Sequence, residues 1–182
     1  LQMVSTRGEG VVQPVVTADD GLLGGCRVDN AYGIGSDTFG NVWLSGWECQ
    51  YALGYNVAGG SWCKVELPYR RKVGRGIAGD LNGDVWASIG GDGQSYLVKW
   101  SGGLCQAGRT ERMGRGDLIQ GPWGANGPTG VNVDASGKVW LSHYLSPVLM
   151  SVDTLNGNDT KAWQTNNVYS FSDATGVVRQ LS

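Results

Sequence analysis

The residue best suited to acid–base chemistry is His143, the single histidine of the 182-residue sequence. An imidazole titrates near neutral pH, so it can take up or release a proton during a reaction. His143 directly follows the strand-like segment 139–142, and no Ser/His/Asp or Cys/His set can be assembled around it from the sequence. We therefore expect it at a strand end near one face of the fold. We assign no catalytic residue.

A second pattern that could carry chemistry is Asp80-Leu81-Asn82-Gly83-Asp84, which begins like a calcium-binding loop. Alternating oxygen-bearing side chains of this kind can wrap a hard cation. Val and Trp follow Asp84 immediately, so the later ligands that such a loop needs are missing. The segment is more typical of a turn, and the sequence predicts neither a metal nor a cofactor.

The four cysteines are an even number and lack the C-x-x-C spacing of zinc or redox sites, which favours disulfides. Cys49 and Cys63 bracket residues 48–62, which we interpret as an inserted loop, and we expect a bridge between them. Cys26 would then pair with Cys105, although four cysteines allow three connectivities and the pairing stays open. Disulfides indicate an oxidising compartment, and the prediction is a secreted, extracellular or cell-surface protein.

An internal repeat indicates the elements that hold these residues. Three stretches match the pattern Gly-[Ile/Val]-x-x-Asp-x-x-Gly-x-Val-Trp-x-Ser at its fixed positions, namely residues 33–45, 76–88 and 130–142. Each copy is typical of a β-hairpin, with an apolar segment, an Asp-x-x-Gly turn and an alternating Val/Trp/Leu segment. The Asp side chain can bond backbone N–H groups two residues on, and Gly supplies a positive φ.

The repeated Asp and Trp residues have structural roles in this interpretation. The predicted turn caps are Asp37, Asp80, Asp134 and, in a degenerate fourth copy that ends the chain, Asp173. We expect these carboxylates to cap turns and not to bind a metal. The predicted core residues are Trp43, Trp86 and Trp140, at equivalent positions on the second strand of each copy.

Each hairpin is followed by at least one further strand-like run. These runs are residues 62–67, 96–100 and 148–152, and Lys161 to Gln164 could add a fourth strand to the last unit. Equivalent Asp residues lie 43 and 54 residues apart, in the range of propeller blades of roughly 40 to 50 residues. The sequence predicts an all-β fold, a β-propeller of four-stranded blades with three complete repeats and one split or incomplete blade.

The predicted organisation is one domain over residues 1–182. Its parts are N-terminal strands that close the ring (1–31), blade 1 (32–74), blade 2 with a long loop (75–128), blade 3 (129–167) and the start of blade 4 (168–182). The N-terminal runs 11–17 and 22–28 would pair with strands at 168–173 and 177–181, which cannot bury their apolar face alone. The alternative is a chain that forms part of a larger propeller or is completed by a partner chain.

Composition narrows the possible partners. The formal net charge of −2 and a pI near 5.3 give no electrostatic basis for nucleic-acid binding. No apolar run reaches the roughly 18 residues of a membrane span, and no stretch has sustained helical periodicity. With 31 glycines, 8 tryptophans and 16% charged residues, the chain is typical of a turn-rich secreted β protein.

The repeat over residues 32–182 resembles the streptogramin-lyase-like (virginiamycin B lyase-type) and NHL-type β-propeller repeats of many secreted bacterial proteins. The resemblance implies a propeller fold. For the lyase itself it implies elimination across an ester-linked depsipeptide ring by histidines and an acidic residue near a bound magnesium ion. This chain has one histidine, so the lyase residues cannot be carried over to it.

Two functions of different class follow. The first is a non-catalytic binding, adhesion or structural module that takes a protein or carbohydrate ligand at a propeller face or at its loops, including residues 47–61 and 107–128. The second is a fragment of a streptogramin-lyase-like enzyme whose remaining catalytic blades are not in this sequence. The sequence favours the first, because it offers a repeat and cysteines but no catalytic constellation.

Overall fold

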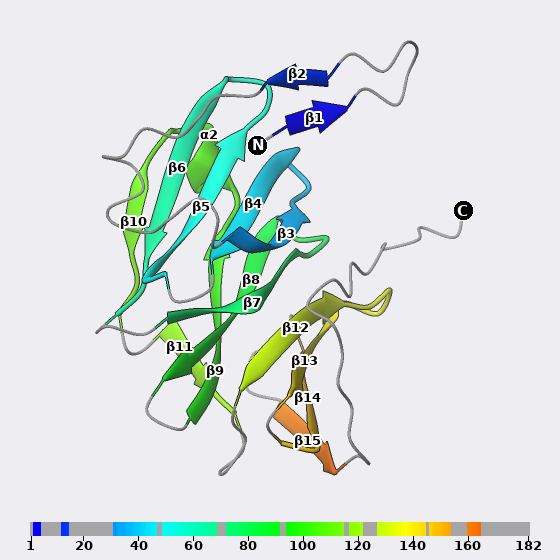
Figure 1. Cartoon of the computed structure of the whole chain (residues 1–182). Helices are drawn as coiled ribbons and strands as arrows, with labels where there is room; N and C mark the ends of the chain where they lie inside the picture. Colours follow the sequence, from blue (N-terminus) through cyan, green and yellow to red (C-terminus); the bar gives the residue numbers. More distant parts are fainter. Residues whose placement is uncertain are drawn as a thin grey trace.

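The computed structural model describes residues 2–4, 12–14, 31–46, 49–68, 72–91, 94–114, 117–121, 127–144, 146–153 and 160–164. In these residues three sheets of mainly antiparallel strands follow one another along the chain and pack face to face (Figure 1). A separate two-stranded sheet pairs β1 (Gln2–Val4) with β2 (Val12–Pro14). The rest of the 11–17 run, and all of 22–28 and 168–182, lie outside the described residues.

Blade 1 consists of β3 (Ala31–Ser36), β4 (Asn41–Gly46), β5 (Tyr51–Asn56) and β6 (Ser61–Glu66), paired antiparallel in chain order. The interpretation of residues 48–62 as an inserted loop is wrong, because this stretch contains β5 and the turn into β6. Its three glycines, Gly54, Gly59 and Gly60, are typical of a loop and favoured that interpretation. A Cβ on Gly54 would collide with the sulfur atoms of Cys63 and Cys105 and with the Trp43 ring, so this glycine serves close packing inside a strand.

Blade 2 consists of β7 (Lys72–Gly79), β8 (Asp84–Gly91), β9 (Gln94–Ser101) and β11 (Leu118–Gln120). Blade 3 consists of β12 (Pro128–Val133), β13 (Lys138–His143), β14 (Val148–Asp153) and β15 (Thr160–Gln164). The fourth strand expected at Lys161 to Gln164 is confirmed as β15. All three blades have the hairpin of the repeat as their first two strands.

The expected long loop 107–128 contains β11 and the short strand β10 (Thr110–Arg112), which pairs parallel with β6 and extends blade 1 by one strand. The short helix α2 (Gly103–Gln106) precedes this stretch. Arg112 donates to Glu66 Oε2 at 2.8 Å across this pairing. The four-residue α2 is far too short to cross a membrane, and no helix in the described part of the chain has the length and apolarity to do so.

The expected bridge between Cys49 and Cys63 is wrong, because Cys63 of β6 is bonded to Cys105 of α2 with a Cα–Cα distance of 5.0 Å. Both sulfur-bearing residues are buried in the core between blades 1 and 2. Cys49 also forms a disulfide, and Cys26 lies outside the described residues. The expected pairing of Cys26 with Cys105 is excluded by the same bond. The bridge therefore joins blade 1 to the helix that follows the third strand of blade 2.

The two larger hydrophobic cores lie between neighbouring blades. In each core, the Val of one repeat packs with the Trp of the preceding repeat. Successive strand residues point to opposite sides of a sheet, so Val and Trp of each Val-Trp pair face different neighbours. Val85 of blade 2 packs with Trp43 of the preceding blade, and Val139 of blade 3 packs with Trp86. We call the Val side of a blade its incoming face and the Trp side its outgoing face.

Candidate functional site

The Asp-x-x-Gly turns form one end of the blades, and their hydrogen bonds follow one scheme. In blade 1, Asp37 Oδ1 accepts from the backbone N–H groups of Phe39 at 2.9 Å and Asn41 at 3.0 Å. Its Oδ2 accepts from the indole Nε1–H of Trp43 at 2.7 Å. Gly40 has a φ of 78° and closes the turn. The Asp therefore holds both the turn and the core tryptophan.

The other two copies repeat this arrangement. The indole of Trp86 donates to Asp80 Oδ2 at 2.8 Å, and that of Trp140 donates to Asp134 Oδ2 at 2.7 Å. Burial alone would raise the pKa of Asp134, but hydrogen bonds from Ser136, Trp140 and two backbone N–H groups lower it to about 2. Across the described residues no group of three or more His, Cys, Asp or Glu side chains is gathered as metal ligands would be. Asp173 lies outside these residues.

The Ser that ends each repeat has a role that the sequence analysis missed. Ser45 Oγ accepts from Gly33 N–H at 3.2 Å within its own hairpin and donates to the Arg75 carbonyl of blade 2 at 2.9 Å. Ser88 in blade 2 likewise accepts from Gly76 N–H at 3.2 Å and donates to the Thr129 carbonyl of blade 3 at 3.3 Å. The recurrence of Ser at one position in three copies was the available signal. In the first two copies this Ser links its blade to the next one.

The repeated Gly that opens each motif belongs to the same contact. A Cβ on Gly33 would collide with the carbonyl oxygen of Arg75, and a Cβ on Gly76 would collide with the carbonyl oxygen of Thr129. The inner strands of neighbouring blades therefore approach each other at backbone distance. Glycine is required at these positions for steric reasons, because only a residue without a Cβ permits this approach.

His143 links blade 3 to blade 2 and is 1% exposed. Its Nδ1 lies 2.9 Å from the Val148 carbonyl oxygen, which can only accept, so Nδ1 carries the proton. Its Nε2 then accepts from the Ser95 hydroxyl at 2.9 Å. Burial lowers the pKa of His143, and the Val148 hydrogen bond opposes this only in part. Both ring nitrogens of the neutral imidazole are thus engaged within the protein.

The opposite end of the blades carries a different set of residues. Register pairs Ala31 with Gly46 and Pro128 with His143, so the first strand starts where the second strand ends, away from the Asp turn. At this open end the Arg75 guanidinium carbon lies 4.9 Å from the ring centroid of Tyr32 and 4.9 Å from that of Tyr144. We call these three residues the Tyr–Arg–Tyr cluster. One residue comes from each of the three blades.

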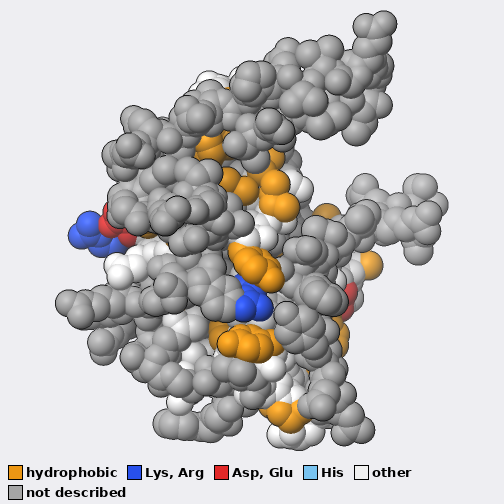
Figure 2. All heavy atoms as spheres, in the orientation of Figure 1, with side chains coloured by type: hydrophobic (Ala, Val, Ile, Leu, Met, Phe, Trp, Pro, Cys, Tyr) orange, Lys and Arg blue, Asp and Glu red, His pale blue; other side chains and the backbone are white. Residues whose placement is uncertain are grey.

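The cluster combines exposure with a fixed geometry. The side chains of Tyr32 and Tyr144 are 44% and 38% exposed, and Arg75 is partly buried. Figure 2 shows one basic group between two hydrophobic groups near the middle of the face that it draws. Cation–π contacts of this kind contribute about 0.5 to 1 kcal/mol each at exposed sites. No sequence pattern indicated this cluster, because its members come together only when three blades pack.

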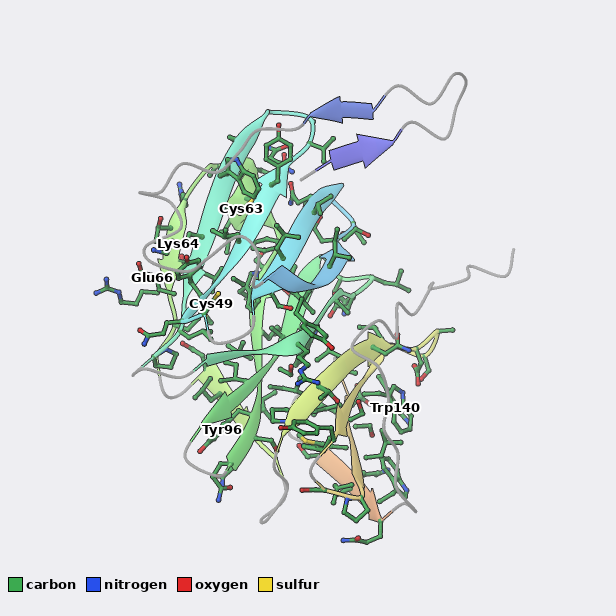
Figure 3. All side chains as sticks on the ribbon, in the orientation of Figure 1. Cys49, Cys63, Lys64, Glu66, Tyr96 and Trp140 are labelled. Carbon is green, nitrogen blue, oxygen red and sulfur yellow. A yellow bond between two sulfur atoms is a disulfide. The ribbon has the colours of Figure 1, made fainter. Side chains whose placement is uncertain are left out.

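The predicted core tryptophans do not share one environment. Trp43 is 0% exposed and Trp86 is 1% exposed, each covered by the next blade. Trp140 is only partly buried and stacks on Trp163 of β15, with ring centroids 5.2 Å apart. Figure 3 places Trp140 on the side of blade 3 that faces away from blade 2. The outgoing face of blade 3 thus differs from those of blades 1 and 2, because its tryptophan is partly exposed and theirs are buried.

No protein-family model and no curated protein matches the sequence. The structure is similar to virginiamycin B lyase from Staphylococcus aureus, at 14% identity and a TM-score of 0.53, over 79% of this chain and 43% of the lyase. A streptogramin B lyase structure matches at 14% identity and a TM-score of 0.56, over 90% of this chain and 47% of that one. A chain of the mitotic checkpoint complex matches at 9% identity and a TM-score of 0.50, over 85% and 40%.

At these identities the likeness shows the fold alone. The protein has a β-propeller fold of the streptogramin-lyase-like kind, which confirms the expected resemblance at that level. The chain spans less than half the length of each of these structures.

Proposed function

We propose that this protein is a secreted or cell-surface binding module that takes up a protein or carbohydrate ligand at the open end of its blades. The Tyr–Arg–Tyr cluster carries the proposal. Tyrosine offers a large amphipathic surface at low cost in side-chain entropy, and Tyr and Arg are enriched among the residues that dominate binding energy. The disulfide between Cys63 and Cys105 supports an oxidising location.

The packing of the cluster also suits a preformed site. Arg75 is held between two rings, so part of the rotamer entropy that a free arginine would lose on binding is already lost in the unliganded protein. Tyr32 and Arg75 both directly precede the repeated Gly of their inner strands, which are rigidly packed against each other. A ligand at this end would therefore meet a surface whose main contacts need little rearrangement.

The test is a screen of the intact chain against immobilised glycans and peptides, followed by binding isotherms for any ligand found. Replacing Tyr32 and Tyr144 together by Ala should weaken binding by at least about tenfold, because exposed aromatic anchors are removed. The matched control is Phe39→Ala, since Phe39 is a 49% exposed aromatic residue at the opposite, turn end. Binding that is lost in the control but kept in the double variant would refute the proposed location.

The second candidate is a fragment of a lyase-like enzyme, and the likeness to the two lyase structures favours it. A further matching structure is of virginiamycin B lyase from Staphylococcus aureus, made catalytically inactive by a histidine-to-alanine substitution, with quinupristin. In the present chain His143 is buried with both nitrogens bonded, so a proton-transfer role would need groups beyond the described residues. Incubation with quinupristin, followed by chromatography, tests this candidate directly. Conversion to a ring-opened product would favour the enzyme over the binding module.

A further inference from the structure

His143 and Tyr144 are neighbours in the chain, and each makes a contact from blade 3 to blade 2. The buried contact is the hydrogen bond of 2.9 Å between His143 Nε2 and the hydroxyl group of Ser95 on β9. The exposed contact is the cation–π contact of the Tyr144 ring with the Arg75 guanidinium, at 4.9 Å from the ring centroid. Because only one planar peptide group separates the two residues, the position of the imidazole restricts where the tyrosine ring can lie.

The protein around the Ser95 hydroxyl group is tightly packed. Ser95 is 0% exposed, and a Cβ on Gly121 would collide with its hydroxyl oxygen. The Gly121 N–H also donates to the Ser95 carbonyl oxygen at 2.8 Å, which ties β9 to the end of β11. On blade 3 the Tyr144 N–H donates to the Gly127 carbonyl oxygen at 2.9 Å. The contact between His143 and Ser95 is therefore held from both blades.

This arrangement fits only a neutral imidazole. Because Nδ1 donates to the Val148 carbonyl oxygen, Nε2 is the nitrogen that accepts the Ser95 hydroxyl proton. A proton on Nε2 removes this acceptor, since both nitrogens of an imidazolium can only donate. The new charge would also lie on a residue that is 1% exposed, and burying a charge without a partner is costly. Protonation therefore favours a conformation in which the end of β13 moves away from Ser95 and the ring reaches water.

No acidic side chain that the structure describes on the strands packed around His143 faces the imidazole. β12 pairs with the end of β13 and, like β11, carries no ionisable side chain. Arg75 of β7 adjoins Tyr144 and is positive, so it opposes a second positive charge nearby. Tyr96 lies beside Ser95 but on the opposite face of β9. The other ionisable side chains described on β8, β9, β13 and β14 lie towards the turn end, namely Asp84, Lys99, Lys138 and Asp153.

We propose that His143 is a positioning residue of the ligand site, and that its protonation in mildly acidic solution moves Tyr144 off Arg75 and weakens binding at the Tyr–Arg–Tyr cluster. The inference rests on the proposed function, because it concerns the regulation of that same site. Burial lowers the pKa of His143 below its ordinary value of 6.5. The stability that His143 gives to the assembled cluster is therefore fully present above pH 6.5 and falls as the pH drops towards the lowered pKa. A ligand taken up at neutral pH would be released in acidic surroundings.

The test follows His143 and Tyr144 in the same samples of the intact chain. Since the sequence has one histidine, the imidazole Cε1–H signal in an NMR titration between about pH 7 and about pH 4 comes only from His143. Fluorotyrosine labelling reports on Tyr144, whose fluorine signal is assigned by its loss in Tyr144→Phe. The Tyr144 signal should shift with the same midpoint as the imidazole signal. The signal of Tyr55, which is 6% exposed in blade 1, should stay unchanged, and circular dichroism should remain that of the folded protein.

Two variants separate a switch from a merely structural histidine. Ser95→Ala removes the hydroxyl group that favours the neutral imidazole, so the pKa of His143 and the midpoint of the Tyr144 signal should rise together, by up to about one pH unit. His143→Gln keeps a polar side chain that cannot titrate, and the Tyr144 signal should then be independent of pH. If His143→Gln does not fold, Ser95→Ala decides alone, because it keeps the imidazole. The matched control is Ser151→Ala, which removes a 3% exposed serine opposite Trp140 on β14 and should move neither midpoint.

Three results would overturn the proposal. They are a Tyr144 signal that stays constant while His143 titrates, a Tyr144 signal that still titrates in His143→Gln, and unfolding of the whole protein before or together with the titration of His143.

The proposed function can fail separately from this switch. For a ligand found in the screen, the dissociation constant should rise by up to about tenfold per pH unit as His143 takes up its proton, because only the neutral form presents the assembled cluster. A ligand that needs Tyr32 and Tyr144 but binds independently of pH would refute the switch and keep the site. A Tyr144 signal that follows His143 in a protein whose ligand binds elsewhere would refute the site and keep the coupled movement.

Discussion

The turn end and the open end of the blades belong to the same hairpins. The key residues at the turn end are the same in all three copies, whereas those at the open end differ from copy to copy. At the turn end, Asp37, Asp80 and Asp134 each accept from two backbone N–H groups and one indole, with almost identical distances. At the open end, the residue before the repeated Gly is the exposed Tyr32, the partly buried Arg75 and the buried Thr129 in turn.

This difference separates the residues that make the fold from those free to serve a ligand. A side chain that recurs in every copy satisfies a requirement that every blade has, and its polar atoms are used in bonds within a blade or to the next blade. A side chain that varies among copies is not required by blade packing, so it can be selected for a contact outside the molecule. Substitutions of repeated residues should therefore destabilise the protein more than substitutions of the varied residues at the open end.

The largest effect is expected at the buried turn-end tryptophans. Trp43→Ala removes the edge-to-face contact with Trp100, at 5.4 Å between centroids, and leaves Asp37 without its indole donor. The expected cost is about 3 to 5 kcal/mol in the free energy of unfolding, measured by urea denaturation. Trp140→Ala should cost clearly less, since that ring is partly exposed. Equal losses at both sites would contradict the assigned environments.

A second prediction concerns the glycine at the inner strands. Gly76→Ala should destabilise the protein by about 1 to 3 kcal/mol, because its methyl group would meet the backbone of Thr129 and Val131. Gly90→Ala is the matched control in the same blade. A Cβ there would meet only Pro128 at 3.5 Å, an ordinary contact, and the change should stay within about 0.5 kcal/mol. Thermal unfolding of both variants compares them, and a neutral Gly76→Ala would show that the blades are not packed at backbone distance.

The third prediction uses the pKa of Asp134, which is lowered from 3.8 to about 2. A lowered folded-state pKa stabilises the protein above pH 3.8, and this contribution is lost as the pH falls towards 2. Asp134→Asn should therefore flatten the pH dependence of unfolding between about pH 5 and pH 2. Ser136→Ala removes one donor and should raise the pKa of Asp134 by up to about one unit, which NMR titration can follow. An unchanged pH profile in Asp134→Asn would contradict the capping account.

The local parts of this architecture could be predicted from the sequence. The Asp bonds reach only two, four and six residues along the chain, so the motif contains every partner of the turn. The strand β5 was missed because glycine is typical of loops. Glycine occupies position 54 because the sulfur atoms of Cys63 and Cys105 leave no room for a Cβ. The Cys63–Cys105 bond joins residues 42 positions apart, and their proximity depends on how two blades pack.

The Tyr–Arg–Tyr cluster could not be predicted either, because the proximity of its residues also depends on how the blades pack. Tyr32, Arg75 and Tyr144 belong to three blades, and their residue types do not recur at the equivalent positions of the other copies. His143 was expected at a strand end, and it is the last residue of β13. Its partners Ser95 and Val148 satisfy it completely within the fold. Varied positions in a repeat were the better place to search for a binding surface.

The smallest effect on stability is expected at that surface. Tyr144→Ala removes a ring that is 38% exposed and one of the two cation–π contacts of Arg75, so the free energy of unfolding should fall by no more than about 1 kcal/mol. Tyr32→Ala should behave alike, and chemical denaturation of both single variants and the double variant measures the coupling between the rings. A loss near that of Trp43→Ala would mean that the open end is part of the blade core. The division between the repeated and the varied residues would then fail, because a residue outside the repeat would be as necessary to the fold as one within it.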